Sequence, residues 1–141
     1  MKKYAVFIII AIVVLACLFF IPTKNNMSGN DLWKNATYTQ DTEFGMGEKT
    51  LFVKVVALEK SVTFTINTNK KTVGEALVEH NLISGDNGQY GLYVKVVNGI
   101  KADYDIDKSY WAFTKNNESM TSGVDKAEFL DGEHYELVYT K

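Results

Sequence analysis

An unbroken apolar run near the start of the chain contrasts with alternating apolar and polar positions further along. Every residue from Tyr4 to Ile21 is apolar, and Lys2 and Lys3 precede the run. A helix of this length, at a rise of about 1.5 Å per residue, just spans a bilayer. A positive region followed by an apolar stretch is the layout of a secretory signal. We therefore interpret residues 1–21 as a signal peptide or an N-terminal membrane anchor.

The sole cysteine lies inside this run and suggests how the chain is tethered. Cys17 follows Val14-Leu15-Ala16, which is similar to the lipobox that precedes the lipid-bearing cysteine of bacterial lipoproteins. The apolar residues 18–21 continue beyond it, so lipidation at Cys17 and retention of an uncleaved anchor both stay open. Both routes predict a location at the extracellular face of a bacterial cell membrane. A single cysteine provides no disulfide framework.

Residues 22–49 lack the periodicity of either a helix or a strand. The segment is rich in Thr, Asn, Gly, Asp and Lys, and such a composition is typical of a linker. It also holds Trp33, Tyr38 and Phe44, which leaves open that part of it packs on a domain. We expect the folded domain to occupy residues 50–141.

The first half of that domain alternates with the period of a strand and then of a helix. Residues 51–58 and 61–66 are rich in β-branched and aromatic side chains, and their apolar positions recur every second residue. Thr72 and Glu75 have the spacing of a capping box, which predicts the start of a helix. Val73, Ala76 and Leu77 would share one face of that helix, which we expect to end near Asn81.

The second half reads as strands separated by turns. We expect a glycine-bearing loop at 84–89, strands at 93–97, 110–114 and 134–140, and a tight hairpin turn at Asn98-Gly99. The order β-β-α-β-β-β with short connections predicts an α+β fold, in which a mostly antiparallel β-sheet is joined by one short helix.

Composition and charge exclude several function classes. The 141-residue chain carries a formal charge of −2 and has no arginine, whereas nucleic-acid binding needs a basic stripe. The two histidines, His80 and His134, are far apart, and we expect both to be exposed and structural. Asp103, Asp105 and Asp107 lack the glycine and glutamate of a calcium loop, which indicates a solvated turn. We expect no catalytic residue, no metal and no cofactor, and hence no enzyme.

Aromatic residues gather in one part of the domain. Six of them fall between positions 90 and 113: Tyr90, Tyr93, Tyr104, Tyr110, Trp111 and Phe113. Strand alternation places Tyr110 on one face and Trp111 with Phe113 on the other. Two interpretations stay open, packing in the core or a rigid aromatic platform beside the 85–91 loop for a flat or amphipathic ligand.

The motifs taken together resemble the transcobalamin-like C-terminal domain, a small domain of exported Gram-positive proteins. The resemblance covers nearly all of 50–141. It rests on these segments in order: Thr72-Val73-Gly74-Glu75-Ala76-Leu77, Gly91-Leu92-Tyr93-Val94, Val97-Asn98-Gly99-Ile100, Tyr110-Trp111-Ala112-Phe113 with Asn116, Gly123, and Asp131-Gly132. In the animal carriers the related domain is the smaller of two lobes that clasp cobalamin, and its Trp-containing strand approaches the corrin. We expect the residues after the apolar run to be too few to hold the larger helical lobe.

The resemblance implies a surface-tethered binding module for a corrinoid or another flat small ligand in nutrient uptake, with cobalamin as cargo. The implied ligand-binding residues are Tyr90, Tyr93, Tyr110, Trp111, Phe113 and Asn116. A membrane transporter or surface protein would then be the partner. The alternative is a structural or protein-interaction module at the cell surface without a small ligand.

Overall fold

A computed structural model describes residues 32–89 and 91–141. The signal peptide or anchor, the lipidation candidate Cys17 and the aromatic residue Tyr90 lie outside the described residues. The described residues belong to one compact unit, Leu32–Lys141. Within that unit no helix is long and apolar enough to cross a membrane.

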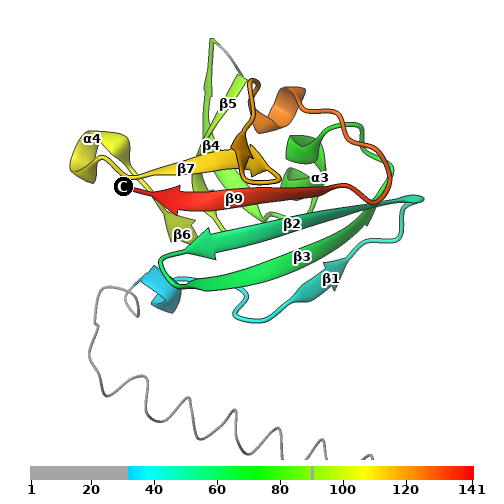
Figure 1. Cartoon of the computed structure of the whole chain (residues 1–141), viewed down its shortest axis with the longest axis horizontal. Coiled ribbons are helices and arrows are strands. Elements are labelled where there is room, and N and C mark those ends of the chain that lie inside the picture. The colour runs from blue at the N-terminus through cyan, green and yellow to red at the C-terminus, as the bar shows by residue number, and fades with distance from the viewer. Residues whose placement is uncertain (1–31, 90) are drawn as a thin grey trace, which may run out of the picture. The chain divides into compact units, whose positions relative to one another are not determined.

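The larger of two sheets has six strands (Figure 1). In spatial order these are β1 (Thr42–Phe44), β3 (Lys60–Thr68), β2 (Lys49–Ala57), β9 (His134–Thr140), β7 (Tyr110–Lys115) and β8 (Glu118–Ser119). The β1–β3 and β2–β9 pairs are parallel, and the other neighbours are antiparallel. The C-terminal strand β9 therefore lies in the interior of the sheet.

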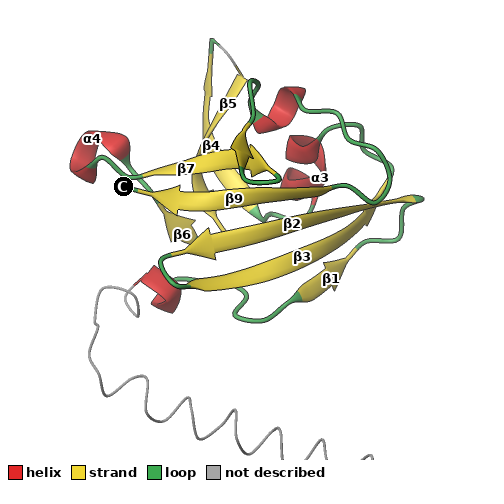
Figure 2. Cartoon of the chain, viewed as in Figure 1, coloured by secondary structure: helices red, strands yellow, loops and turns green. Residues whose placement is uncertain are grey.

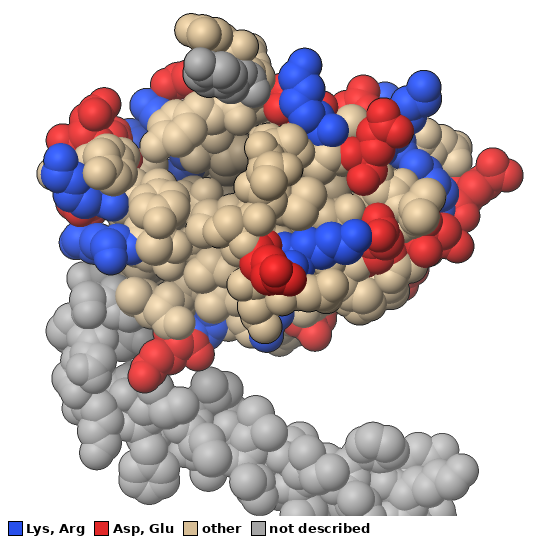
Figure 3. Space-filling view, turned by 45° about the horizontal axis from the view of Figure 1, so that its top comes forward, with Lys and Arg blue, Asp and Glu red and all other residues tan. Residues whose placement is uncertain are grey.

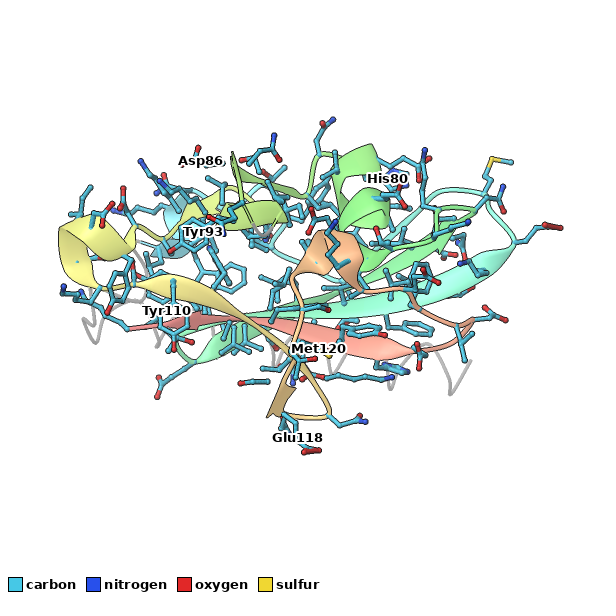
Figure 4. The ribbon with its side chains drawn as sticks, turned by 90° about the horizontal axis from the view of Figure 1, so that it is seen from above. His80, Asp86, Tyr93, Tyr110, Glu118 and Met120 are labelled. Carbon is cyan, nitrogen blue, oxygen red and sulfur yellow. The ribbon has the colours of Figure 1, made fainter. Side chains whose placement is uncertain are left out.

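The second sheet is smaller and antiparallel throughout. It contains β4 (Ile83–Gly88), β5 (Gly91–Val97) and β6 (Ile100–Lys101) in that order. Short helical segments join the strands (Figure 2), namely α3 (Val73–Glu79), α4 (Tyr104–Asp107) and the 3-10 helix η1 (Val124–Lys126), and residues 32–34 at the start of the described part are also helical. Both α3 and η1 lie on the same side of the large sheet as β4 and β5 (Figure 4).

The core forms on that side of the large sheet, because alternate strand residues point there. In β2 the side chains of Leu51, Val53 and Val55 are fully buried, and Phe64 and Ile66 of β3 continue the same layer. The alternation expected for these two strands is confirmed. Leu77 of α3 and Val97 of β5 close the layer from the other side.

Two local signals in the sequence are also confirmed. Thr72 accepts a hydrogen bond from the backbone N–H of Glu75, and the Glu75 side chain accepts one from the backbone of Thr72, which makes the expected capping box. Asn98 and Gly99 both have positive φ, 54° and 80°, and connect β5 to β6 as the expected tight turn.

The α+β class is confirmed, but the expected order and the antiparallel sheet need correction. Two strand pairs of the large sheet are parallel, and the strand order contains more strands than expected. The expected loop at 84–89 is largely strand β4, whose residues apart from Ile83 have little intrinsic strand preference. Pairing with β5 holds this strand in place, with an irregularity at Ser84/Gly85.

The folded unit also begins earlier than residue 50. Trp33 is buried and donates its indole N–H to the carbonyl of Ala57 at 3.0 Å. Phe44 packs edge-on against Phe64 while β1 pairs with β3. Residues 32–49 are therefore part of the domain rather than a linker, because their aromatic side chains complete its core. The remaining part of the expected linker, 22–31, lies outside the described residues.

Candidate functional site

A groove separates α3 from one face of the β4–β5 hairpin. Its volume is about 660 Å³, within the range of about 300–1,000 Å³ typical of small-molecule sites. It is lined by Lys70, Gly74, Glu75, Val78, Glu79, Asn81, Ile83, Ser84, Gly85, Asn87, Leu92 and Asp125. The groove is thus built from one helix, one strand pair and η1.

Two glycines let the elements that border the groove pack closely against their neighbours. The β4 residues Ile83, Ser84, Gly85 and Asn87 line the groove, and the irregularity of the strand pairing at Ser84/Gly85 lies among them. Gly85 contributes no side chain, and a Cβ there would lie 1.9 Å from the carbonyl oxygen of Tyr93. At Gly74 a Cβ would lie 2.9 Å from the backbone of Asp125. Both glycines therefore allow close backbone approach where a side chain could not fit.

Asp125 links η1 to the β4–β5 hairpin at one end of the groove by a hydrogen bond. Its Oδ2 accepts a hydrogen bond from the backbone N–H of Leu92 at 3.0 Å. Its Oδ1 is buried without a hydrogen-bond partner in the described part of the chain. A Cβ on Gly91 would lie 2.5 Å from Oδ2, so the carboxylate needs a glycine at that position.

A second hollow adjoins the groove at the other end of α3. It holds about 470 Å³ and shares Lys70 and Glu79 with the groove. His80, the C-cap of α3, lines it. Its Nε2 is buried, has no hydrogen-bond partner among the described residues, and lies 3.6 Å from Glu79 Oε1. The His80 ring packs against Phe44 at 5.2 Å between centroids. His80 was expected to be exposed, but its side chain is only 21% accessible, because the segment that carries Phe44 covers it.

The structure does not gather the expected aromatic residues on one surface. Trp111 is 7% exposed and donates its indole N–H to the carbonyl of Ile100 at 3.2 Å, which makes it a core residue. Phe113 shares its face, is half-buried, and stacks on Tyr135. Tyr110 lies on the opposite face of β7, with its ring 6.3 Å from that of Tyr104.

Of the other expected site residues, Tyr93 lies on a different strand and Asn116 directly follows β7. Tyr93 lies on β5 and is 47% exposed (Figure 4). It lines a third hollow, of about 370 Å³, together with the hairpin tip and Gly123. Its neighbour Lys95 pairs with Asp86 at 2.9 Å, and this pairing raises the pKa of Lys95 above its usual value. Asn116 has φ 53° and forms the β7–β8 turn.

Sequence reasoning located one wall of the groove and missed the others. The glycine-bearing stretch at 84–89 was predicted as a loop, and it contributes Ser84, Gly85 and Asn87 to the groove, although as part of strand β4. Nothing in the sequence indicated that Val78 and Asp125 would line one groove, because α3 and η1 come together only through packing between residues about fifty positions apart.

Metal-binding side chains are not clustered within residues 32–89 and 91–141, where no group of three His, Cys, Asp or Glu could hold an ion. Asp103 caps α4 by accepting from the backbone N–H of Asp105. Asp107 accepts from Ser109, which lowers the pKa of Asp107 below its usual value. The second histidine, His134, is exposed and stacks on Phe52 with ring centroids 4.4 Å apart.

Charges of both signs are mixed on the surface. Figure 3 shows lysines and carboxylates interspersed around a broad area without charged side chains. The groove itself carries the carboxylates of Glu75, Glu79 and Asp125 against the single ammonium of Lys70. The described surface thus offers a mildly acidic groove rather than a field of one sign.

Comparison with known proteins places this architecture. The model of a family described as a domain of unknown function (DUF4430) matches residues 70–141. A candidate metal-binding protein from Ruminococcus gnavus ATCC 29149, known from a crystal structure, shares 32% sequence identity with this chain. The two structures superimpose with a TM-score of 0.63, and the match covers 67% of this chain and 98% of the other. Haptocorrin in complex with Cbi is 16% identical, with a TM-score of 0.57, over 70% of this chain and 26% of haptocorrin. The haptocorrin likeness is one of fold alone. No curated protein matches the chain.

Proposed function

Because the chain belongs to the DUF4430 family and folds like part of haptocorrin, we propose that it is a binding module for a small ligand, which lies in the groove between α3 and the β4–β5 hairpin. The observation that carries the proposal is the groove itself, which has the volume of a ligand site and is bordered by two glycines that let its elements pack closely. A corrinoid is the first ligand class to test, because the haptocorrin structure contains Cbi. Binding rather than catalysis is the proposed activity.

The form of the groove bears on the affinity. It is open on one side, so a ligand would bury only part of its surface, and affinity should be modest compared with that of a carrier that closes on its cargo from two sides. Val78 is 49% exposed and supplies an apolar contact on the helix wall. Ile83 and Leu92 supply apolar contacts on the strand wall.

The proposal includes the location and the tether. Residues 1–21 would hold the module at the extracellular face of a bacterial membrane, where it would pass its ligand to a transporter. Metabolic lipid labelling of the wild type and of Cys17→Ser separates lipidation from an uncleaved anchor. Label that disappears in the variant supports the lipoprotein, whereas a membrane-bound wild type that never takes up label supports the anchor.

The test of binding is calorimetric titration of the full chain in detergent micelles with cobinamide and with cobalamin. Val78→Glu places a charge in the apolar wall of the groove and should abolish binding of any ligand held there. Ile106→Glu is the matched control, because Ile106 is 77% exposed and lies on α4, outside the groove lining. Binding that is equal in both variants would contradict the groove as the site.

A titration series with divalent cations belongs in the same experiment, since the Ruminococcus gnavus relative is described as a candidate metal-binding protein. Saturation by a cation alone, with no response to either corrinoid, would replace the corrinoid with a metal ion as the ligand. The absence of a response in every titration would favour the alternative, a structural or protein-interaction module at the cell surface without a small ligand.

A further inference from the structure

Two Asn-Gly pairs of this chain lie in opposite environments. Asn98, which precedes Gly99, is only 1% exposed. Its side chain makes two hydrogen bonds of 2.8 Å with the backbone of Tyr38. Asn87, next to Gly88, is exposed at the end of β4, and its side chain makes no hydrogen bond to any residue that the structure describes. The side chain of the asparagine is therefore held by hydrogen bonds in one Asn-Gly pair, and by no described residue in the other.

An asparagine followed by glycine can react with its own backbone. The backbone nitrogen of the glycine attacks the side-chain Cγ, a new N–Cγ bond forms, and the Cγ–Nδ2 bond breaks. Ammonia leaves with the proton of the attacking nitrogen, and a five-membered succinimide remains. Water then opens either C–N bond of the ring and yields aspartate or isoaspartate. The reaction needs no oxidant or reductant, and water is the one co-reactant.

Glycine favours this reaction because it has no Cβ to obstruct the approach. At Gly88 the described surroundings are open as well, since a Cβ there would meet no atom of a described residue closer than 3.8 Å. At Gly99 a Cβ would lie 2.3 Å from the carbonyl oxygen of Asn35, so that turn is enclosed by protein. Reaction at Asn98 would first require local unfolding, whereas reaction at Asn87 requires only movement near a hairpin tip.

We infer that Asn87 is a site of spontaneous deamidation and that the modification adds a carboxylate to the wall of the groove. The inference does not depend on any ligand, because it follows from the exposure of Asn87 and the absence of hydrogen bonds from its side chain to described residues.

The position of Asn87 gives the modification a structural consequence. Asn87 pairs with Leu92 across the hairpin, and the backbone N–H of Leu92 donates to Asp125. A carboxylate at position 87 adds a negative charge to a groove that already holds Glu75, Glu79 and Asp125. Isoaspartate also adds a methylene to the β4 backbone, which disturbs the register at this pair. Modified molecules should thus have a looser hairpin tip and a more acidic groove.

The test is incubation of the full chain in detergent micelles at mildly alkaline pH, followed by peptide mapping with mass spectrometry. We expect the mass increase that accompanies replacement of –NH₂ by –OH to accumulate at Asn87 at least about tenfold faster than at Asn98, since tenfold corresponds to only about 1.4 kcal/mol of local opening. Asn98 in the same molecule is the internal control.

Gly88→Ala keeps Asn87 in place while it adds a Cβ that the open surroundings accept. This variant should slow the reaction at Asn87 and leave Asn98 unchanged. Equal rates at the two asparagines, or a rate at Asn87 that Gly88→Ala leaves unaltered, would overturn the inference. Asn87→Asp, compared with wild type in cobinamide titration, then reports the effect of the new charge on the groove separately from the existence of a groove ligand.

Discussion

The side-chain amide of Asn98 replaces a strand partner for the backbone of Tyr38. Asn98 Oδ1 accepts from the Tyr38 N–H and Asn98 Nδ2 donates to the Tyr38 carbonyl, each at 2.8 Å. The backbone N–H of Thr37 also donates to the Asn98 carbonyl at 2.9 Å. One turn residue therefore attaches the segment before β1 to the small sheet, sixty positions further along the chain.

Replacing Asn98 with alanine should destabilise the domain by about 2–3 kcal/mol, because two buried hydrogen bonds are lost at about 1 kcal/mol each and alanine resists the positive φ. Urea unfolding monitored by circular dichroism measures this loss. Asn98→Gly retains the backbone freedom and isolates the hydrogen bonds, so a glycine variant as stable as the wild type would show that the amide contributes nothing.

Gly99→Val should cost at least about 1 kcal/mol, since a β-branched residue resists the φ of 80° at this position. The added Cβ would also lie 2.3 Å from the carbonyl oxygen of Asn35. Gly88→Ala is the matched glycine control, because its surroundings are open. If the two variants unfold at the same urea concentration, the turn imposes no constraint.

Adjacent positions of β7 should respond oppositely to truncation. Trp111→Ala removes a core side chain and its hydrogen bond to Ile100, and we expect a loss of about 3–5 kcal/mol. Tyr110→Ala removes a side chain that is 38% exposed on the other face, and we expect less than about 1 kcal/mol. The urea denaturation midpoints of the two variants, each compared with wild type, measure these losses. A Trp111→Ala protein with near-native stability would show that Trp111 lies outside the core.

Stability should fall in acid partly through Glu133. Lys115 Nζ lies 2.6 Å from Glu133 Oε2, and this contact, with the backbone N–H of Leu130, holds the pKa of Glu133 below its usual value. The stabilisation is complete above the unfolded-state pKa of about 4.3 and is lost as the pH falls through the lower folded-state value.

Glu133→Gln should therefore lower the unfolding midpoint near neutral pH, and its difference from wild type should shrink as the solution is acidified. Glu118→Gln, at an exposed position of β8, serves as the control. A difference that stays constant over the acidic range would show that the carboxylate charge at Glu133 is not the cause.

Trp33→Ala should destabilise the domain although Trp33 precedes the large sheet. Its ring is 7% exposed and its N–H donates to Ala57, so we expect about 3–5 kcal/mol, as for other buried aromatic residues. Thermal melts of Trp33→Ala and Trp33→Phe separate packing from the hydrogen bond. For the same reason a chain that starts at residue 50 should be less stable than one that starts at Leu32.

The sequence revealed those features that depend on neighbouring residues. The alternation in β2 and β3, the capping box of Thr72 and Glu75 and the Asn98-Gly99 turn are local, and each is confirmed. Features that depend on distant partners were not accessible. Strand β4 has a loop-like composition and exists through pairing with β5, and residues 32–49 look like a linker until Trp33 meets Ala57.

The candidate site shows the same division. A cluster of aromatic residues indicated a platform, but alternation along β7 could not tell which face the core would use. The structure assigns the core to Trp111 and leaves Tyr110 outside. The groove depends on Gly74 and Gly85, whose role comes from contacts with Asp125 and Tyr93 that lie far from them in sequence or across a strand pair.

The interior position of β9 has a consequence for the order in which the chain can fold as it is made. β9 pairs with β2 on one side and with β7 on the other, so the sheet halves β1-β3-β2 and β7-β8 are joined only through it. A chain synthesised from its N-terminus at about 5–20 residues per second exposes both halves before the strand between them exists. The two halves can thus join only after β9 emerges, and until then β2 and β7 each present an unpaired strand edge.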